Sequence, residues 1–426
     1  MSGASSQKTL ADRCTSTVKT FILACILVTI SGTLPSIASE APALLPIADL
    51  SHRQCVNILA LGADREGKND AGPAFRSAIE ANSMPAICVY FPKGTYRFAS
   101  APVVTLPMDS AYRSAAVAII GDGSGLTILQ PDPDVNGLTI HLNGSQQSFH
   151  IRDLSIVASN KGKSSTGLSI YQDKARSPNP AQSDIIGVSI HGKDGINGTY
   201  RFDRGIYLHQ VSNVNLMNTA IVGSSDGAPY ATVGTCLYLD GSHDSIPVQI
   251  NIVSSQINSC QHGIHYGPYV QGIQILASNF VGNSVAIYQP DGNKGNDQLS
   301  IVGSQFNSGD RNIFLRSAIG GVSITGNDFY LADSGTASIE MLGVQFSIQG
   351  NCFIQLGAPR GSAISIGHYL LDAGIITGNS FDNFKIGLLL QDGSDKVNVQ
   401  SNAYSNIATM NVIDKGRHNV IGGGSP

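Results

Sequence analysis

Histidine, tyrosine and aspartate side chains recur at matching places in three short apolar segments of the chain. Tyr207 and His209 alternate with apolar residues in the first segment, Tyr238 and Asp240 do so in the second, and His265 lies in the third. Alternate residues of a strand point to the same face, so these side chains share one face if the segments pair as neighbouring strands. An imidazole can remove a proton next to a carboxylate, and a phenol can protonate the oxygen that leaves in a β-elimination. The sequence therefore predicts a catalytic cluster in which His265 or His209 is the base and Tyr207 or Tyr238 is the acid.

Aromatic and charged residues extend this face on both sides of the cluster. With Ile206 inward, the same register predicts an outward row, one residue per strand: Ser169, Tyr207, Tyr238, His265, Tyr288, Phe314 and Glu340. Exposed rings suit the apolar faces of sugars, so the predicted substrate-binding residues are Tyr171, Tyr288, Phe314, Arg316 and Glu340. Arg316 is the candidate to neutralise a substrate carboxylate, although about 14 Å separates it from Tyr238. The alternative is that loops at 172–184, 223–234 and 289–298 fold back and cover the row.

Two other functions remain open on these residues. Hydrolysis of a glycoside needs two carboxyl groups about 5 to 9.5 Å apart, for which Asp240 could pair with Asp203, Asp226 or Asp244. Glu340 lies four strands from Asp240, about 19 Å, which excludes that pair in this register. A non-catalytic carbohydrate-binding surface protein would need only the aromatic residues. No metal ligand set is recognised, and no cofactor is predicted, calcium being possible but unsupported.

The segments that carry these residues belong to a repeat. Its clearest copies, at 322–329, 346–353, 375–381 and 397–404, alternate apolar residues and then place a small residue and Asn before a large apolar residue. The closing residues of successive copies from about residue 221 onward are 23 to 36 residues apart. Three short strands per repeat, with no helical segment between them, predict one coil of a parallel β-solenoid. Equivalent residues of neighbouring coils then lie about 4.8 Å apart.

This repeat also contains two series of residues that we assign to structure and not to catalysis. Aromatic residues close successive coils and should stack inside the solenoid: Phe280, Phe306, Phe329, Phe353, Phe381 and Tyr404. Asn327, Asn351, Asn379 and Asn402 precede the closing residues and should form a ladder at the turns.

Composition excludes several classes of protein. Charged residues make up 13% of the 426 residues, the net charge is −4, and no basic block is present, so nucleic acid is not an expected partner. The 47 glycines disfavour a mainly helical protein. The negative net charge mildly disfavours a strongly anionic polymer as substrate. This argument opposes the uronate substrate that the histidine and tyrosine cluster predicts.

The N-terminus predicts export. Basic residues precede an apolar run at 21–30 that is too short to span a bilayer, and small residues follow at 36–38, so residues 1–38 read as a signal peptide. The expected location is secreted, extracellular or periplasmic, without a stable membrane anchor. Five cysteines remain after cleavage: Cys55, Cys88, Cys236, Cys260 and Cys352. A disulfide between Cys55 and Cys88 requires their strands to be neighbours, and the other pairings stay open.

The region after the signal peptide resembles a known superfamily. Apolar residues at helical spacing in 71–82, after Asp70 as a possible N-cap, predict a capping helix that hides the first coil. The stretches 56–58, 61–64, 67–70, 74–79 and 89–96 together resemble the N-terminal signature of the pectate-lyase-like superfamily. The resemblance implies an all-β, single-stranded right-handed parallel β-helix of about 10–12 coils with an N-terminal capping helix. We place the strand and helix cap at 39–100 and the β-helix at 101–426.

The resemblance stops short of a subfamily. Members include polygalacturonases, pectate-type lyases and phage tail-spike depolymerases, but the polygalacturonase motif set is missing. The nearest fragment, 262–265, lacks the accompanying carboxylates, and the mannuronan epimerase Asp-Pro-His-Asp motif is also absent. The sequence therefore predicts an exported polysaccharide lyase acting on an exopolysaccharide or uronate-containing glycan, with glycoside hydrolysis as the alternative. A polysaccharide is the expected partner, and both a monomer and a homotrimer stay open.

Overall fold

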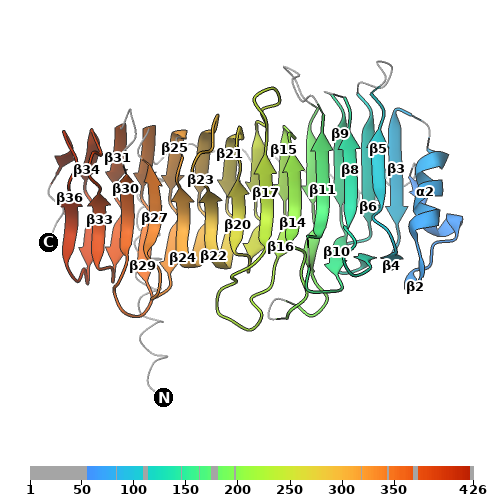
Figure 1. Ribbon diagram of the computed structural model, residues 1–426, viewed down its shortest axis with the longest axis horizontal. Helices are drawn as coiled ribbons and strands as arrows, with labels where there is room; N and C mark the ends of the chain where they lie inside the picture. The colour runs from blue at the N-terminus through green and yellow to red at the C-terminus, as the bar shows by residue number, and fades with distance from the viewer. Residues whose placement is uncertain are drawn as a thin grey trace, which may run out of the picture. The chain divides into compact units, whose positions relative to one another are not determined.

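Three ladders of parallel strands build the molecule. The computed structural model describes residues 55–82, 84–108, 114–144, 146–162, 164–173, 181–195, 198–317, 319–342, 345–367 and 373–422. The predicted signal peptide at 1–38 lies outside the described residues. All pairings between the named strands are parallel, and coils follow one another in sequence order from β3 toward β36 (Figure 1).

In the described part of the chain, sheet 1 contains 14 strands, and the solenoid has about 12 turns, in line with the predicted 10–12 coils. Its strands are β1 (Val56–Asn57), β3 (Ala86–Phe91), β6 (Ala116–Gly121), β9 (Ser148–Arg152), β12 (Ser183–Ile186), β15 (Val214–Met217), β18 (Ile250–Val253), β21 (Gln271–Leu276), β23 (Asp297–Val302), β25 (Gly320–Thr325), β28 (Gln345–Gln349), β31 (Ala373–Thr377), β34 (Val397–Gln400) and β37 (Val420–Ile421).

The other 23 strands form two ladders, which we call sheets 2 and 3. Sheet 2 contains β2 (Glu66–Asp70), β4 (Gly94–Phe98), β7 (Thr127–Pro131), β10 (Ser155–Ala158), β13 (Ser189–Gly192), β16 (Ala220–Val222), β19 (Gln256–Asn258), β26 (Asp328–Leu331), β29 (Cys352–Gln355), β32 (Ser380–Asp382) and β35 (Ala403–Ser405). Sheet 3 contains β5 (Val103–Leu106), β8 (Leu138–Leu142), β11 (Thr166–Gln172), β14 (Arg204–His209), β17 (Thr235–Asp240), β20 (His262–Tyr266), β27 (Ala337–Leu342), β30 (Ser362–Gly367), β33 (Ile386–Leu390) and β36 (Met410–Asp414). Two long strands, β22 (Asn279–Gln289) and β24 (Gln305–Leu315), bend through both sheets and join them.

Small residues form the corner where a coil enters sheet 3. A Cβ atom on Gly205 would lie 2.6 Å from the carbonyl oxygen of Cys236, and one on Gly263 would lie 2.5 Å from that of Ala286. Such distances are too short for a Cβ atom, so these two positions of the corner need glycine. This close approach explains the glycines that begin many of the strands of sheet 3.

The two structural ladders predicted from the repeat are confirmed. Rings from Phe280 to Tyr404 stack between successive coils with centroids 4.8 to 5.2 Å apart. Asn351 donates its side-chain amide to Asn379 Oδ1 and to the carbonyl oxygen of Ile324, both at 3.0 Å. The Oδ1 atom of Asn351 in turn accepts from the backbone N–H of Asn327 at 2.9 Å. Both ladders therefore stabilise the interior and are unavailable for catalysis.

An α-helix covers the first coils, as the apolar spacing predicts. Helix α2 (Gly72–Ala81), beside the 3-10 helix η2 (Ile58–Leu61), buries Ala74, Phe75 and Ala78. Its N-cap residue is Ala71, so the prediction of Asp70 as N-cap is wrong by one residue. The Asp70 carboxylate still accepts from the first helical N–H, that of Gly72, at 3.0 Å, because its short side chain reaches past Ala71. Parallel pairing begins at Val56, inside the segment 39–100 that the sequence assigned to the cap.

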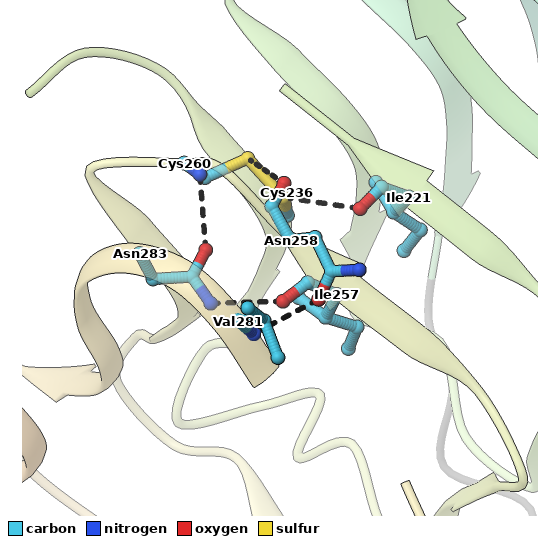
Figure 2. The surroundings of a disulfide bond; sticks show 7 residues. All are labelled: Ile221, Cys236, Ile257, Asn258, Cys260, Val281 and Asn283. Carbon is cyan, nitrogen blue, oxygen red and sulfur yellow. Dashed lines mark hydrogen bonds between the residues drawn. A yellow bond between two sulfur atoms is a disulfide. The ribbon is translucent and has the colours of Figure 1, made fainter. Parts of the chain in front are cut away.

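Two disulfides join neighbouring coils in the described part of the chain. Cys55 and Cys88 are bonded, as the sequence allowed, because β1 pairs with β3 in the register that places them opposite each other. Cys236 of sheet 3 is bonded to Cys260, which lies just before β20 (Figure 2). The sequence did not predict this second pairing, since a spacing of 24 residues does not reveal which coils are adjacent.

Candidate active site

The outward row predicted from the sequence is present in the strand register of sheet 3. Tyr207 pairs with Tyr238 and with Ser169, which is buried; Tyr238 pairs with His265, and the series continues through Tyr288 and Phe314 to Glu340. Strands β14, β17 and β20, which carry the five candidate catalytic residues, are direct neighbours (Figure 1). All five side chains are half-buried and lie on the outer face. The structure therefore brings Tyr207, His209, Tyr238, Asp240 and His265 together.

Three of these residues form a hydrogen-bonded triangle. His209 Nδ1 lies 2.7 Å from Asp240 Oδ1, and the Tyr207 hydroxyl donates to Asp240 Oδ2 at 3.0 Å. The same hydroxyl lies 3.2 Å from His209 Nδ1. The carboxylate is 17% exposed and the imidazole 30%, so water competes only partly for these bonds. Asp240 consequently uses both oxygens to orient the other two side chains.

Asp240 also decides the protonation of its neighbours. Its hydrogen bond to the imidazole raises the pKa of His209, which favours the imidazolium form. Burial, reinforced by the Asp240 charge, raises the pKa of the Tyr207 phenol, and the same two causes raise the pKa of Tyr238. The cluster thus holds two protonated phenols and a histidine that retains a proton more readily than usual.

His265, the second histidine of the cluster, has a lowered pKa and therefore favours the neutral form. Burial, followed by repulsion from Arg204, lowers the pKa of His265 to about 4. Its ring stacks on Tyr238 with centroids 4.4 Å apart and also contacts Tyr288 and His262. Burial and repulsion from His265 lower the pKa of His262 to about 4 as well. His265 is therefore a neutral imidazole, able to accept a proton, over the whole neutral range.

The sequence did not identify Arg204 and His262 as site residues. Strict alternation would place Arg204 inward, but Gly205 and Ile206 are both buried because the chain bends at the corner. Arg204, Thr235 and His262 consequently form a second outward series beside the row. The signal that could have revealed this series is the glycine at the start of several of these strands, which marks the corner.

Arg204, and not Arg316, is the arginine that lies beside the cluster and can bind a substrate carboxylate. The Arg204 guanidinium carbon lies 5.2 Å from the ring centroid of Tyr207 and 4.9 Å from that of Tyr238. Arg316 instead forms ion pairs with Asp291 at 3.2 Å and Glu340 at 3.4 Å. Since two carboxylates already compensate its charge, Arg316 is the weaker partner for a substrate carboxylate.

The predicted substrate-binding residues fall into two groups on either side of the cluster. Tyr171 stacks on His141 with centroids 5.0 Å apart and contacts the Tyr207 ring, so it extends the site toward β8. On the other side, Tyr288 stacks on His262 at 4.0 Å. Beyond it, Phe314 lies under the guanidinium groups of Arg311, at 4.3 Å, and Arg316, at 5.7 Å.

An ion-pair network lies at the Phe314 and Glu340 end of the row. Glu340 accepts from Arg311 Nε at 2.7 Å and is also paired with Arg316. Arg311 is further paired with Asp310. The charges of this network compensate one another, and two of its guanidinium groups lie over the ring of Phe314.

The loops named as possible covers flank the strands of sheet 3. In the loop 223–234, Tyr230 donates its hydroxyl to Asn307 Oδ1 at 2.9 Å and Ala231 N–H donates to the carbonyl oxygen of Gly282, both at the corner with sheet 2. The loop 289–298 is anchored at the opposite strand ends, where Asn293 donates to the carbonyl oxygen of Tyr266 at 2.7 Å. Part of the loop 172–184 lies outside the described residues. The two described loops leave the central side chains of the row partly exposed.

The described residues contain no group of three or more His, Cys, Asp or Glu side chains arranged to hold a metal ion. Among the same residues, no helix has the length and apolar character needed to cross a bilayer. What the site does contain is a neutral imidazole, an imidazole biased toward protonation, two phenols and a guanidinium within three neighbouring coils. Such a set can remove a proton, supply one and hold an anion.

Comparisons with known proteins agree with the fold. Residues 55–178 match the family model described as rhamnogalacturonase A/epimerase, pectate lyase-like. The A-module of the Azotobacter vinelandii mannuronan C-5 epimerase AlgE6 is similar in structure, with a TM-score of 0.64 and 16% identity over 87% of this chain and 99% of that one. The Dettilon tailspike protein has a TM-score of 0.51 and 14% identity over 82% of this chain and 68% of that one.

No curated protein is significantly similar in sequence. At these identities the solved structures establish the fold and leave the reaction open. They agree with the fold expected from the sequence: the chain is a right-handed parallel β-helix, and its N-terminal segment 55–178 matches a pectate lyase-like model.

Proposed function

We propose that this protein is a polysaccharide lyase that cleaves a uronate-containing glycan by β-elimination. The observation that supports this most directly is the opposite protonation of two histidines in one cluster. His265 stays neutral because its pKa falls to about 4, whereas Asp240 raises the pKa of His209. Paired groups whose pKa values are driven apart are the pattern expected of a general base and a general acid.

Each side chain of the cluster has a role in such a reaction. The neutral imidazole of His265 removes the proton on the carbon next to the substrate carboxylate. The electron pair forms a carbon–carbon double bond as the bond to the glycosidic oxygen breaks, and that oxygen takes a proton from Tyr207, Tyr238 or His209. Arg204 holds the substrate carboxylate and stabilises the negative charge that develops beside it.

Hydrolysis by paired carboxylates has less support. Both oxygens of Asp240 are occupied by His209 and Tyr207, and Asp244 is on a loop with its side chain 95% exposed. Glu340 lies four coils away and is paired with two arginines. The Azotobacter vinelandii neighbour is a mannuronan C-5 epimerase. Epimerisation also begins with proton removal, and it is therefore an outcome that the experiment must distinguish.

The proposal includes export to the periplasm or the cell exterior, where the substrate would be met. Two disulfides in the described part of the chain support this location, because disulfides persist in oxidising compartments.

Incubation of the purified protein with a panel of acidic and neutral polysaccharides tests the proposal. A lyase produces ultraviolet absorbance from an unsaturated uronate at each new chain end. Reducing ends without this absorbance indicate a hydrolase, an altered uronate configuration without chain cleavage indicates an epimerase, and binding without products indicates a carbohydrate-binding protein. His265→Gln should remove the absorbance and Tyr207→Phe should lower it, and cleavage that is unchanged in both variants would contradict the assigned site.

A further inference from the structure

The disulfide between Cys236 and Cys260 lies directly beside the proposed site. Cys236 is in β17, two residues before Tyr238, and Cys260 precedes His262 by two residues. The bond therefore links the strand that carries Tyr238 and Asp240 to the strand that carries His262 and His265. Its Cα atoms are 5.7 Å apart, across one coil spacing.

The turn that contains Cys260 is held on its other side by buried polar contacts (Figure 2). The backbone N–H of Cys260 donates to Asn283 Oδ1 at 2.9 Å, and Asn283 donates its amide to the carbonyl oxygen of Ile257 at 2.8 Å. Asn258 Oδ1 accepts from the N–H of Val281 at 2.9 Å. Asn283 is fully buried, so its two bonds are protected from water, whereas the bond between Val281 and Asn258 is exposed. They join the turn to β22, and the disulfide joins it to β17.

Side-chain packing at this corner holds β17 and β20 in place only weakly. The positions equivalent to Cys236 on the adjacent coils are Gly205 and Gly263, which have no side chain to interlock. A small cavity beside the bridge is lined by Phe202, Ile221, Thr235 and Cys260, among others. Where side-chain packing leaves space, a covalent link is what limits the movement of one strand past the next.

We propose that the Cys236–Cys260 disulfide is a positioning element of the active site, which holds β17 and β20 in the register that stacks Tyr238 on His265. The inference rests on the proposed function only for its kinetic consequence. The stack has a centroid distance of 4.4 Å, and proton transfer needs such groups placed to within a fraction of an ångström.

The double variant Cys236→Ala/Cys260→Ala tests this role. Alanine fits at the corner, since Ala286 and Ala363 occupy equivalent positions in other coils. The matched control is Cys55→Ala/Cys88→Ala, which removes the second disulfide of the described residues, located in the first coils of sheet 1. The sequence separation of this control disulfide, 33 residues, is close to the 24 residues of Cys236–Cys260, so loop closure predicts a similar loss of thermal stability in both variants.

The kinetic comparison uses the substrate that the wild-type protein cleaves best. We expect Cys236→Ala/Cys260→Ala to lower kcat by about 10- to 100-fold with little change in KM. The control should keep kcat within about twofold, as expected for a change remote from the reacting groups.

A second measurement does not depend on catalysis. NMR titration of the His265 ring reports its surroundings, which include Arg204 from β14, Tyr238 and Asp240 from β17, His262 from β20 and Tyr288 from β22. Without the bridge, water should enter and the pKa of His265 should move from about 4 toward the ordinary 6.5, while the control variant leaves it unchanged.

Equal kcat in both variants together with an unshifted His265 titration would overturn the positioning role. If the wild-type protein cleaves none of the glycans, the proposed function fails. The NMR comparison between the two variants then decides the structural inference by itself.

Discussion

The hydroxyl of Tyr207 donates a 3.0 Å hydrogen bond to Asp240, a residue 33 positions later in the chain and one coil away in the β-helix. The same carboxylate binds His209, the residue two positions after Tyr207 on the same strand. One aspartate thus sets the orientation and the protonation of two candidate proton donors. The cross-coil contact exists because β14 and β17 pair in a register that places His209 opposite Asp240.

The first prediction concerns this carboxylate. Asp240→Asn keeps the shape of the side chain but removes the charge that raises the pKa of His209, so the acid loses its proton at a lower pH. We expect kcat to fall by about 10²- to 10⁴-fold and the basic limb of the pH–rate profile to move to lower pH. Asp244→Asn, on the adjacent exposed loop, is the control and should leave the profile unchanged.

Thermal melts provide a second readout for the same variant. A raised histidine pKa stabilises the folded state fully below the ordinary value of 6.5 and is lost as the pH rises through the folded-state value. Asp240→Asn should therefore lower the Tm more at pH 5 than at pH 9. A loss of Tm that is the same at both pH values would contradict the ion-pair account.

The second prediction concerns the pH dependence set by His265. Its pKa of about 4 keeps the imidazole neutral above that value, so the acidic limb of kcat/KM should have its midpoint near pH 4. His265→Gln should abolish cleavage at every pH. An acidic midpoint near 6.5 in the wild-type protein would show that another histidine, or a differently exposed His265, is the base.

The same shift has a consequence for stability. Between about pH 4 and 6.5 the unfolded chain binds protons at His262 and His265 that the folded chain does not, so stability should rise with pH across this window. His262→Phe keeps a ring that can stack on Tyr288 and removes one of the two titrating groups. Its Tm should vary less between pH 4.5 and 6.5 than that of the wild-type protein.

The third prediction separates the two arginines of the site. Arg204→Ala should raise KM for a uronate substrate and lower kcat/KM by about 10- to 100-fold, because a charge-assisted contact to the carboxylate is lost. Arg316→Ala should change kcat/KM by less, since Arg316 is already paired with Asp291 and Glu340. The reverse order of effects would return the carboxylate-binding role to Arg316.

The fourth prediction tests the asparagine ladder. Asn351→Leu leaves the N–H of Asn327 and the carbonyl oxygen of Ile324 without their partner in the core, and it should cost about 2–4 kcal/mol of unfolding free energy. Asn351→Ser should cost less, because Ser278 and Ser304 occupy the same ladder, where the Ser304 hydroxyl accepts from the N–H of Ser278 at 3.1 Å. Chemical denaturation of the two variants measures the difference, and an unchanged unfolding free energy in both would show that the ladder contributes no specific stability.

The sequence by itself determined the coil and the faces of its strands. Apolar alternation with a repeat of 23 to 36 residues predicts a parallel β-solenoid, in which every coil buries the same positions against its neighbours. On this ground the sequence places Phe329 inside the coil and Asn351 in a ladder at the turns, and the stacked rings and the amide ladder confirm both. The same regularity placed Tyr207, Tyr238 and His265 in one outward row, since a strict period carries a register from coil to coil.

Only the tertiary structure decided which charges meet. The sequence pattern did not identify Arg204, because Gly205 and Ile206 are both buried at the corner and strict inward–outward alternation fails there. Arg316 fitted the pattern but lies between two carboxylates, one of them in the loop after β22. The pairing of Cys236 with Cys260 and the opposite pKa shifts of His209 and His265 likewise depend on contacts across coils. Local periodicity fixes which way a side chain points, whereas its electrostatic partners come from loops and neighbouring coils whose positions no local pattern specifies.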